Sequence, residues 1–320
     1  MNSTPSKIPV LNPDQVLKKM QAHDSKAWST YYSFYSSWFG GIIKNPGALL
    51  VLPLDDHMAH RGDAVFEALK AIDRKIYLLE AHVKRLKASA EKIGIIFPHS
   101  PEYLEKVIIE TLQVANQTSA VVRVFLSRGP GSFTANPYDS VGSQLYVVVT
   151  QLNPPAPEKY LYGVKIGRSL IPVKEGLMPQ IKSCNYLPNV LMKKESVDRK
   201  LDFTVSFDSD KHVTESATEN LVIVDANGVL THPPFAKILM GTTMIRAFEL
   251  ATKAGTKTAI RSISEKDILS AREVLMMGTT LDILPVTSYE NHSISDGKVG
   301  PVAKSLNALL QIDIQHGKSF

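Results

Sequence analysis

Hydrophobic residues recur with a helical period along several parts of the chain. Leu79, Val83, Leu86, Ala90 and Ile93 follow one another at intervals of three or four residues, which is typical of a helix that buries one face. We predict further helices at 63–72, 101–116, 242–254, 265–271 and 301–312, and a short helix opened by the proline at position 13. Helices are thus expected in both halves of the chain.

Between these helices, short runs of apolar and β-branched residues predict strands. They are expected at 48–54, 75–79, 120–127, 145–150, 161–167 and 202–207, and as a hairpin of 220–224 with 229–231 turned by an Asn-Gly pair. Aromatic residues crowd into 28–39, and a strand is expected in the second half of that segment, up to the turn at Gly40-Gly41. We interpret these aromatics as residues of a buried sheet and of a subunit contact, in preference to a platform for stacking ligands.

The best candidate for a linker lies at 153–159, which reads Asn-Pro-Pro-Ala-Pro-Glu-Lys. Three prolines in four positions stiffen the chain and interrupt any regular element. We therefore divide the chain into an N-terminal extension at 1–27, a small domain at 28–152, the linker at 153–159 and a larger domain at 160–320. Because strands dominate beyond the linker, the pattern predicts an α/β (α+β) protein with a strand-rich C-terminal half.

Composition restricts the class of protein. The hydrophobic fraction of 44% and the charged fraction of 21% are ordinary for a globular protein, and no apolar run approaches the roughly 20 residues of a membrane span. No apolar segment of a secretory signal follows the first charge, so we expect a cytoplasmic protein that does not bind membranes. The net charge of +5 is dispersed along the chain, which argues against a nucleic-acid partner.

Metal and serine chemistry find little support. A single cysteine, Cys184, excludes an internal disulfide and a Cys-x-x-Cys metal site. His57 and His60 lie three residues apart beside two aspartates, but no further ligand set is evident, so we predict no metal. No Gly-x-Ser-x-Gly motif occurs that would present a serine nucleophile.

Lys182 is the residue with the most suggestive surroundings, because it lies in an uncharged run from 179 to 188. A lysine among apolar neighbours loses solvation of its charged form, so its pKa falls and the neutral amine becomes accessible. Only the neutral amine attacks an aldehyde to form a Schiff base. The ordinary alternative is a lysine whose stem is buried and whose ammonium reaches water.

Two identical triplets, Gly241-Thr-Thr243 and Gly278-Thr-Thr280, are candidates for a phosphate site. The first opens a predicted helix, whose free N–H groups and macrodipole attract an anion. Arg85 is a candidate partner for the same phosphate, since its guanidinium forms charge-assisted hydrogen bonds. Each alone has an ordinary explanation, a turn or a helix cap for the triplets and a solvated helix residue for Arg85.

Glu215 precedes a strand that is expected to be buried. A carboxylate there could keep a pyridine nitrogen protonated, which makes the ring a stronger electron sink. Glu219 is an equal rival on composition alone.

Several of these residues fall in motifs that follow one another along the chain. They are His60-Arg-Gly-Asp-Ala-Val-Phe-Glu67, Leu79-Glu-Ala-His-Val-Lys-Arg85-Leu86 with Ser89-Ala90, Ile181-Lys182-Ser-Cys-Asn185-Tyr-Leu, Thr214-Glu215 with Glu219-Asn220-Leu, Ile238-Leu-Met-Gly241-Thr-Thr243, and Gly278-Thr-Thr280 with Pro285-Val286. In this order they resemble the class IV aminotransferases, the fold-type IV family of pyridoxal-phosphate enzymes, over about residues 30–315.

The resemblance implies a two-domain fold-type IV enzyme, with an N-terminal α/β sandwich domain and a C-terminal strand-rich pseudo-barrel domain. It implies pyridoxal 5'-phosphate held as a Schiff base on Lys182, which then serves as the catalytic general base. Family members pair into dimers, so a homodimer is expected. The residues that the resemblance assigns to cofactor binding are Arg85, Lys182, Tyr186, Glu215, Thr242, Thr243 and Thr279.

Within the family, four segments look closest to plant-type D-amino acid aminotransferases. They begin at Phe39, Leu52, Gly129 and Gly300. That lineage is linked to D-transamination and to aminodeoxychorismate cleavage. We therefore predict transfer of an amino group between an amino acid, in the first place a D-amino acid, and a 2-oxo acid. The alternatives are a 4-amino-4-deoxychorismate lyase that releases pyruvate and 4-aminobenzoate, a branched-chain amino acid aminotransferase, and a carrier that binds the cofactor without turnover.

Two positions depart from the bacterial D-amino acid enzymes. Those enzymes hold the substrate carboxylate with an Arg-x-His pair where this chain reads Ser132-Phe-Thr-Ala, and they have a tyrosine where this chain has Phe66. The carboxylate must then be bound by other groups, for which Arg123 and Arg128 are the candidates. Phe66 and Thr280 complete the predicted substrate-binding residues.

Overall fold

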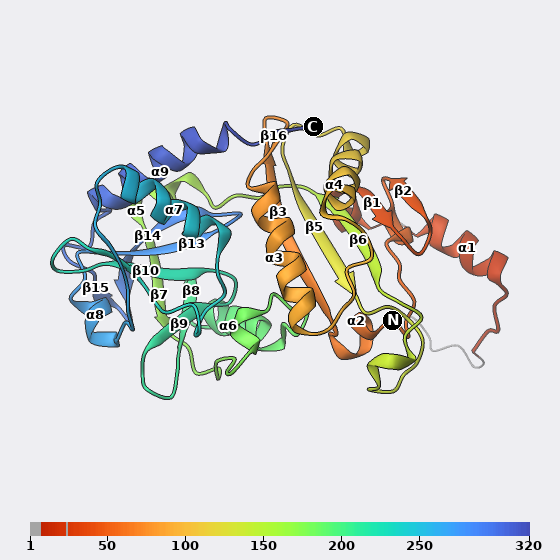
Figure 1. Ribbon diagram of the computed structural model, residues 1–320, viewed down its shortest axis with the longest axis horizontal. Helices are drawn as coiled ribbons and strands as arrows, with labels where there is room; N and C mark the ends of the chain where they lie inside the picture. Colours follow the sequence, from red (N-terminus) through yellow and green to blue (C-terminus); the bar gives the residue numbers. More distant parts are fainter. Residues whose placement is uncertain (1–7, 24) are drawn as a thin grey trace.

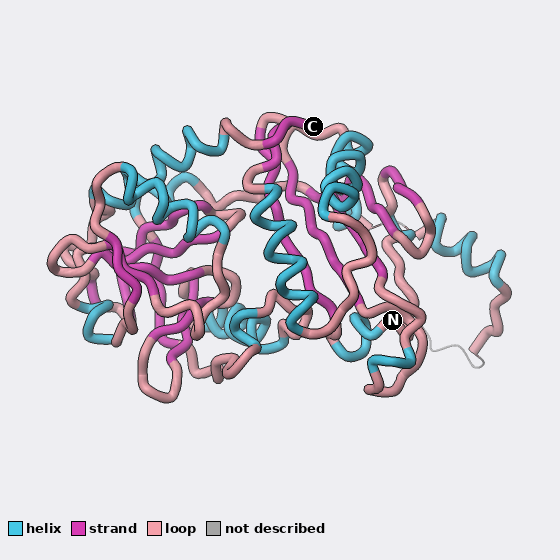
Figure 2. The backbone as a smooth tube through the Cα atoms, in the orientation of Figure 1, coloured by secondary structure: helices cyan, strands magenta, loops and turns pink. Residues whose placement is uncertain are grey.

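The computed structural model describes residues 8–23 and 25–320, in which two β-sheets lie side by side, each with its own helices (Figures 1 and 2). In the described residues the first sheet has seven strands in the order β16-β4-β3-β5-β6-β1-β2. Their bounds are β1 (Tyr31–Ser36), β2 (Gly41–Lys44), β3 (Ala64–Ile72), β4 (Lys75–Ile76), β5 (Ala120–Ser127), β6 (Gln144–Thr150) and β16 (Lys318–Ser319).

Helices α3 (Leu79–Lys92) and α4 (Pro101–Ala115) cover one face of this sheet. Side chains alternate across a strand, so Val65, Leu69 and Ala71 of β3 point toward the helices. Leu86 of α3 and Leu112 of α4 meet them in a single buried cluster. Glu67 lies on the same face of β3 and is therefore a carboxylate inside an apolar layer.

The second sheet follows the order β12-β11-β10-β13-β14-β7-β8-β9, and β9 also pairs with β10, so the strands from β10 to β9 close into a barrel. The bounds are β7 (Val164–Arg168), β8 (Phe203–Phe207), β9 (Val213–Ser216), β10 (Asn220–Val224), β11 (Leu230–His232), β12 (Thr258–Ile260), β13 (Glu273–Gly278), β14 (Asp282–Tyr289) and β15 (His292–Ser293), which pairs with β14.

The helices of this half are α5 (Pro157–Tyr162), α6 (Leu187–Asp198), α7 (Thr242–Lys253), α8 (Glu265–Leu269) and α9 (Pro301–Ile314). Helices α7 and α9 pack on β13 and on one another, around a second apolar cluster. Beyond α9 the chain returns to the first sheet, where β16 pairs with β4 (Figure 1). The boundaries that we drew from the sequence stay a prediction.

Near the N-terminus, α1 (Pro13–Ala22) confirms the short helix opened by a proline, and α2 (His57–Arg61) precedes β3. Four 3-10 helices complete the described elements: η1 (Lys26–Thr30), η2 (Gly47–Leu49), η3 (Pro137–Asp139) and η4 (Met178–Gln180). In the described part of the chain, no helix has both the length and the apolar character to cross a bilayer.

Two of the predicted elements are wrong in kind. Segment 63–72 is the strand β3 instead of a helix, because its pairing with β5 along the whole strand outweighs the helix propensity of its alanine, leucine, glutamate and lysine residues. Segment 48–54 forms no strand; it contains the end of η2, and it lacks the buried face that a strand would have.

Other differences concern boundaries and missed elements. Residues 157–162 form α5, which begins at Pro157, so the strand expected at 161–167 starts only at Val164. Of the strand expected at 75–79, only Lys75–Ile76 pairs, because α3 begins at Leu79. Helix α6 and strands β9, β13 and β14 were not predicted.

Candidate active site

Segment 182–184 is held against the beginning of β3. The Phe66 N–H donates to the Lys182 carbonyl at 2.9 Å, and the Cys184 N–H donates to the Ala64 carbonyl at 2.8 Å. Val65 and Ser183 form an isolated β-bridge between them. The lysine backbone is thus fixed like a short extra strand on the edge of β3 that β4 leaves free.

The Lys182 side chain lies among aromatic rings. Its Nζ atom is 4.7 Å from the centre of the Phe66 ring and 6.0 Å from that of Tyr186, whose ring meets Phe66 edge-on. Nζ has no hydrogen bond or ion pair with any described residue. Burial lowers the pKa of this amine to about 8, and the charge of Arg85 acts in the same direction. The neutral fraction near pH 7 is therefore about a tenth, far above that of a lysine with the ordinary pKa of 10.5.

Glu67 is the centre of a buried hydrogen-bond network on the face of β3 that the helices cover. Its carboxylate accepts from Nε and from one terminal nitrogen of Arg85, both at 2.7 Å, and binds Nδ1 of His82 at 2.7 Å. Burial alone would raise the pKa of the Glu67 carboxyl, but Arg85 and His82 outweigh it and hold that pKa at about 2. The carboxylate stays ionised and fixes both side chains of α3.

The same network reaches the beginning of α7. A second terminal nitrogen of Arg85 donates to the Met240 carbonyl at 2.8 Å, and Nε2 of His82 lies 3.2 Å from the Thr242 hydroxyl. No side chain caps this helix, so the N–H groups of its first turn are available to an anion. Arg85 has five N–H donors and uses three of them here. We call Glu67, His82, Arg85 and the start of α7 the phosphate end of the site.

Gly241 allows this arrangement. A Cβ atom at that position would lie 1.9 Å from Oδ1 of Asn220, the first residue of β10, whose amide donates to the Leu239 carbonyl at 3.0 Å. Strand β10 therefore anchors the loop that leads into α7. Asn220 is also in register with Met277, one residue before the second triplet, so both Gly-Thr-Thr triplets lie near the start of β10.

The second triplet forms the turn between β13 and β14. Gly278 pairs with Asp282, and Thr279 and Thr280 lie between them. Asp282 forms an ion pair with Lys70, a buried residue of β3, and accepts from Gln311 at 3.2 Å. The turn is thus tied to the first sheet and to α9.

Glu215 lies on β9, opposite Asn220 of β10. Its carboxylate accepts from the Leu239 N–H at 3.1 Å, and burial raises the pKa of this carboxyl to about 7.

Lys174 and Tyr186 lie against one another beside this carboxyl. The Lys174 Nζ is 4.8 Å from the centre of the Tyr186 ring. Burial lowers the pKa of the Lys174 amine, and the charge of Glu215 opposes that shift. Burial, followed by Glu215, raises the pKa of the Tyr186 phenol, which therefore stays protonated. We call Lys174, Lys182, Tyr186 and Glu215 the reacting end of the site.

The two arginines that we expected to bind the substrate carboxylate both have partners within the protein. Arg128 forms an ion pair with Asp63 through Nε at 2.5 Å, and its other nitrogens donate to the carbonyls of Ile93 and Gly94. Arg123 lies two residues along β5 from Phe125, and it donates to the Thr150 hydroxyl at 2.7 Å. Phe66, by contrast, lies against the Lys182 amine. The substrate roles of these residues stay a prediction.

Three residues of the site were not singled out as functional in the sequence. Glu67 and His82 lie inside quoted motifs, but their pairing joins β3 to α3 and α7, which no periodicity reveals. Lys174 lies eight positions before Lys182 in a segment without a motif. A glutamate set among apolar residues, between Phe66 and Ala68, was the signal in the sequence that could have drawn attention to Glu67.

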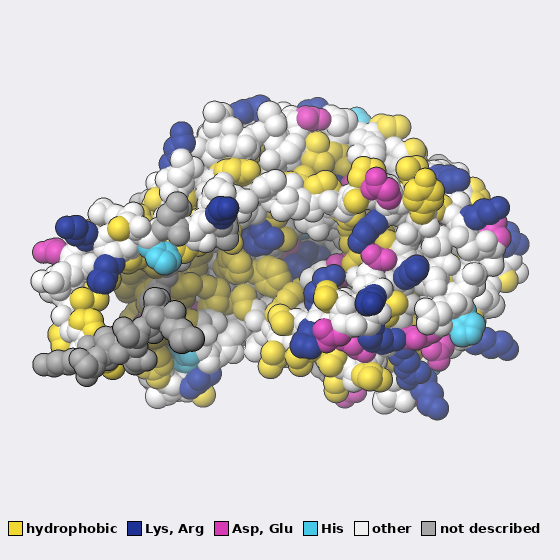
Figure 3. All heavy atoms as spheres, turned by 180° about the vertical axis from the view of Figure 1, so that it is seen from behind, with side chains coloured by type: hydrophobic (Ala, Val, Ile, Leu, Met, Phe, Trp, Pro, Cys, Tyr) yellow, Lys and Arg dark blue, Asp and Glu magenta, His cyan; other side chains and the backbone are white. Residues whose placement is uncertain are grey.

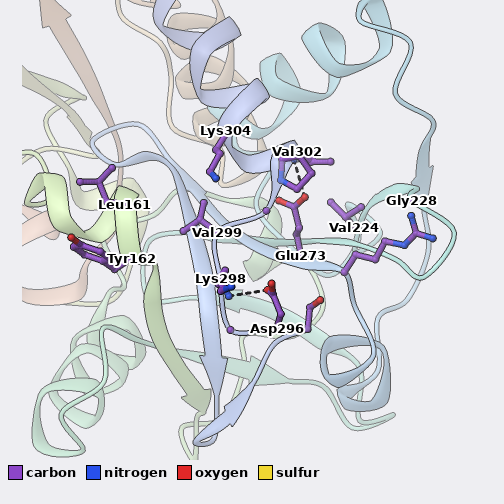
Figure 4. Close-up of a pocket in the computed structure, with 15 residues that line it drawn as sticks. Leu161, Tyr162, Val224, Gly228, Glu273, Asp296, Lys298, Val299, Val302 and Lys304 are labelled. Atoms are coloured by element: carbon purple, nitrogen blue, oxygen red, sulfur yellow. Dashed lines mark hydrogen bonds between the residues drawn. The ribbon is translucent and has the colours of Figure 1, made fainter.

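The surface is hollowed between the two halves, and hydrophobic and basic side chains gather in the hollow (Figure 3). A separate cleft of about 660 Å³ lies at the opposite end of the barrel, near Val224 and Glu273 (Figure 4). There the Glu273 carboxylate accepts from the N–H groups of Val302 and Ala303 at 2.8 and 2.9 Å. This carboxylate is thus used to cap α9, and none of the residues lining the cleft is a candidate site residue.

The amino-transferase class IV family matches this chain over residues 64–289, so the chain belongs to the class IV aminotransferases. The family confirms that the protein is an enzyme that uses pyridoxal phosphate, as we predicted. Chloroplastic D-amino-acid transaminase of Arabidopsis thaliana is 31% identical over 97% of this chain and 83% of its own length.

Solved structures share the fold. Branched-chain amino acid aminotransferase from Escherichia coli superimposes with a TM-score of 0.81 at 23% identity, over 87% of this chain and 92% of its own. A Legionella pneumophila protein provisionally assigned as a 4-amino-4-deoxychorismate lyase gives 0.75 at 25% identity, over 82% and 95%. The two-domain fold-type IV architecture expected from the sequence is confirmed.

Proposed function

We propose that this enzyme transfers the amino group of a D-amino acid to a 2-oxo acid, with pyridoxal phosphate held between the phosphate end and the reacting end of the site. The observation that supports this most is Lys182, an amine without a polar partner among the described residues and with a pKa of about 8, placed between an anion site and a buried carboxylate. The preference for D-amino acids rests on the similarity to the plant transaminase.

The residues present fit this cofactor. Its phosphate requires N–H donors and positive charge, which the first turn of α7 and Arg85 supply, with Thr243 and Thr279 as the proposed hydroxyl donors. Its protonated pyridine nitrogen requires a carboxylate, and Glu215 is a buried carboxyl whose pKa, raised to about 7 by burial, would be lowered by such a cationic neighbour. Its aldehyde requires a neutral amine, which is Lys182.

When bound, pyridoxal phosphate supplies an aldehyde that condenses with amines and a ring that withdraws the electron pair left on Cα after proton loss. The chain provides the remaining functions. Lys182 is the base that accepts the Cα proton and returns it, because about half of its amine is neutral at pH 8. Glu215 would hold the ring nitrogen in its protonated form. Phe66 and Tyr186 form apolar walls that keep water from Nζ.

The test is the absorbance spectrum of the purified holoenzyme, repeated after addition of D-alanine and, separately, of L-leucine, without any oxo acid. Loss of the visible cofactor band with D-alanine alone is the expected result. Loss with L-leucine alone would contradict the proposed handedness and favour a branched-chain substrate.

A lyase acting on 4-amino-4-deoxychorismate is the second candidate. It is favoured by the likeness to the Legionella pneumophila structure, while Ser132-Phe-Thr-Ala in place of an Arg-x-His pair argues against strict D-alanine specificity. If neither amino acid changes the spectrum, release of 4-aminobenzoate from aminodeoxychorismate, followed by fluorescence, tests this activity. The homodimer and the cytoplasmic location stay predictions.

A further inference from the structure

His82 is a buried imidazole that joins the two halves of the molecule. It belongs to α3, which packs on the first sheet, and it lies between Glu67 of β3 and Thr242 of α7, which packs on the second. The side chain is 2% exposed. Nothing in the chemistry proposed above requires a histidine at this position.

The hydrogen bonds of His82 assign its protons. Glu67 is ionised, and an ionised carboxylate only accepts, so Nδ1 of the imidazole must carry a hydrogen. Burial lowers the pKa of His82 and the charges of Arg85 and Lys182 act in the same direction, against Glu67. The ring is therefore neutral and Nε2 has a free lone pair. The Thr242 hydroxyl then donates to Nε2 across the 3.2 Å that separate them.

We infer that His82 is a positioning residue for the cofactor phosphate. It accepts a hydrogen bond from the Thr242 hydroxyl and so holds the first turn of α7 in a fixed place relative to Arg85. This inference rests on the proposed function. One carboxylate, Glu67, then orients both sides of the phosphate site: Arg85 directly, through two hydrogen bonds, and α7 through His82.

This assignment changes the role of Thr242. Its hydroxyl donates its hydrogen to His82, so the hydroxyl is not available to donate to the phosphate. Thr242 contributes its backbone N–H and the position of the turn. Thr243 becomes the donor hydroxyl of this triplet. A link of this kind matters because the phosphate donors come from two elements that no strand pairing connects, α3 and α7.

Matched substitutions separate the two contacts of His82. In His82→Asn the amide nitrogen takes the place of Nδ1 and still donates to Glu67, but nothing reaches Thr242. Thr242→Val removes the hydroxyl at almost constant volume, and Thr242→Ser restores it. His292→Asn, at an exposed histidine of β15, is the control.

The measurement is the equilibrium affinity of the full chain, freed of cofactor, for pyridoxal phosphate and for pyridoxal, which lacks the phosphate. His82→Asn and Thr242→Val are expected to weaken pyridoxal phosphate about tenfold, as the loss of one buried hydrogen bond does, and to leave pyridoxal unchanged. The double variant loses no more than either single one, because both remove the same bond. Thr242→Ser and His292→Asn keep the original affinity.

Equal losses for both ligands would overturn the inference, since His82 would then act on the fold as a whole. Full additivity in the double variant, or a loss in Thr242→Ser as large as in Thr242→Val, would do the same. The proposed function fails separately: in that case the original chain binds pyridoxal phosphate no better than pyridoxal, or forms no visible band with it.

Discussion

The two ends of the site differ in whether their charged groups form ion pairs. At the phosphate end, Glu67, His82 and Arg85 satisfy one another through hydrogen bonds of 2.7 Å, and the Glu67 pKa falls to about 2. At the reacting end, Lys182 and Glu215 form no ion pair with described residues, and their pKa values move to about 8 and about 7. Both ends are buried, so burial alone does not explain the difference; the presence or absence of an ion-pair partner does.

The phosphate end is suited to binding the cofactor, and the reacting end is suited to proton transfer. Paired groups are rigid and keep one charge, which suits the recognition of a phosphate whose charge does not change during turnover. Lys182 and Glu215, which have no ion-pair partner among the described residues, have pKa values of about 8 and about 7, which suits proton transfer. Substitutions at the reacting end should therefore change rates, whereas those at the phosphate end should change affinity and stability.

The largest effect is expected from Lys182→Ala. Without the amine, the reacting end loses the base that accepts the Cα proton, so nearly all turnover and the visible cofactor band should disappear. Absorbance and a transamination assay check both. Lys174→Ala is the comparison, since it removes a nearby amine that lies over the same Tyr186 ring. Turnover that persists in Lys182→Ala would falsify the assignment.

Glu67→Gln should destabilise the phosphate end, because it removes the carboxylate that binds both Arg85 and His82. It leaves the Arg85 charge buried without its carboxylate, which costs about 3 kcal/mol or more in the free energy of unfolding. Denaturant unfolding measures this cost. Glu249→Gln removes an exposed partner of Arg246 and should cost well under about 1 kcal/mol. If the two variants lose the same stability, the phosphate end is not held by charge pairing.

Glu215→Gln should bind the cofactor but react about 100-fold more slowly, a loss typical of removing one fixed electrostatic group. The amide keeps an acceptor for the Leu239 N–H, so the fold of the loop before α7 is preserved. Cofactor affinity and the rate of turnover are measured separately. An unchanged rate would move the role of pyridine partner to another acid, with Glu219 as the next to test.

The smallest effect concerns stability and pH in the cofactor-free chain. The pKa of Lys182 is about 8 in the folded chain against the ordinary 10.5, so the unfolded chain binds more protons between these values. Stability from this group therefore rises as the pH increases from about 8 to 10.5 and is constant below 8. Lys182→Met should lack this rise and be more stable than the original chain at pH 7. Parallel pH profiles for the two proteins would mean that the amine is not desolvated.

Much of the reacting end could be predicted from the sequence because its residues lie in motifs of fixed spacing. Lys182, Tyr186 and Glu215 are named by those motifs, and the structure brings them together. Their roles still await the experiments above. Phe66 also lies where a substrate contact was expected.

The phosphate end was less accessible to sequence reasoning. The helical pattern assigned to 63–72 hid the strand β3, and without that strand Glu67 has no reason to face His82 and Arg85. Arg128 was predicted as a candidate for binding the substrate carboxylate, but in the structure it bonds to Asp63, which lies 65 positions earlier. Such pairings depend on which strands are neighbours, and local spacing carries no information on that.

The return of β16 to β4 has a consequence for how the protein is made. Phe320 donates its N–H to the Arg74 carbonyl and packs its ring 5.3 Å from that guanidinium, a contact between positions 246 residues apart. The edge strand β16 of the first sheet is synthesised only after the whole barrel. Until then β4 presents unpaired backbone groups, which are the usual template for association with other chains. The first sheet is thus expected to keep this short open edge while the second half of the chain is synthesised.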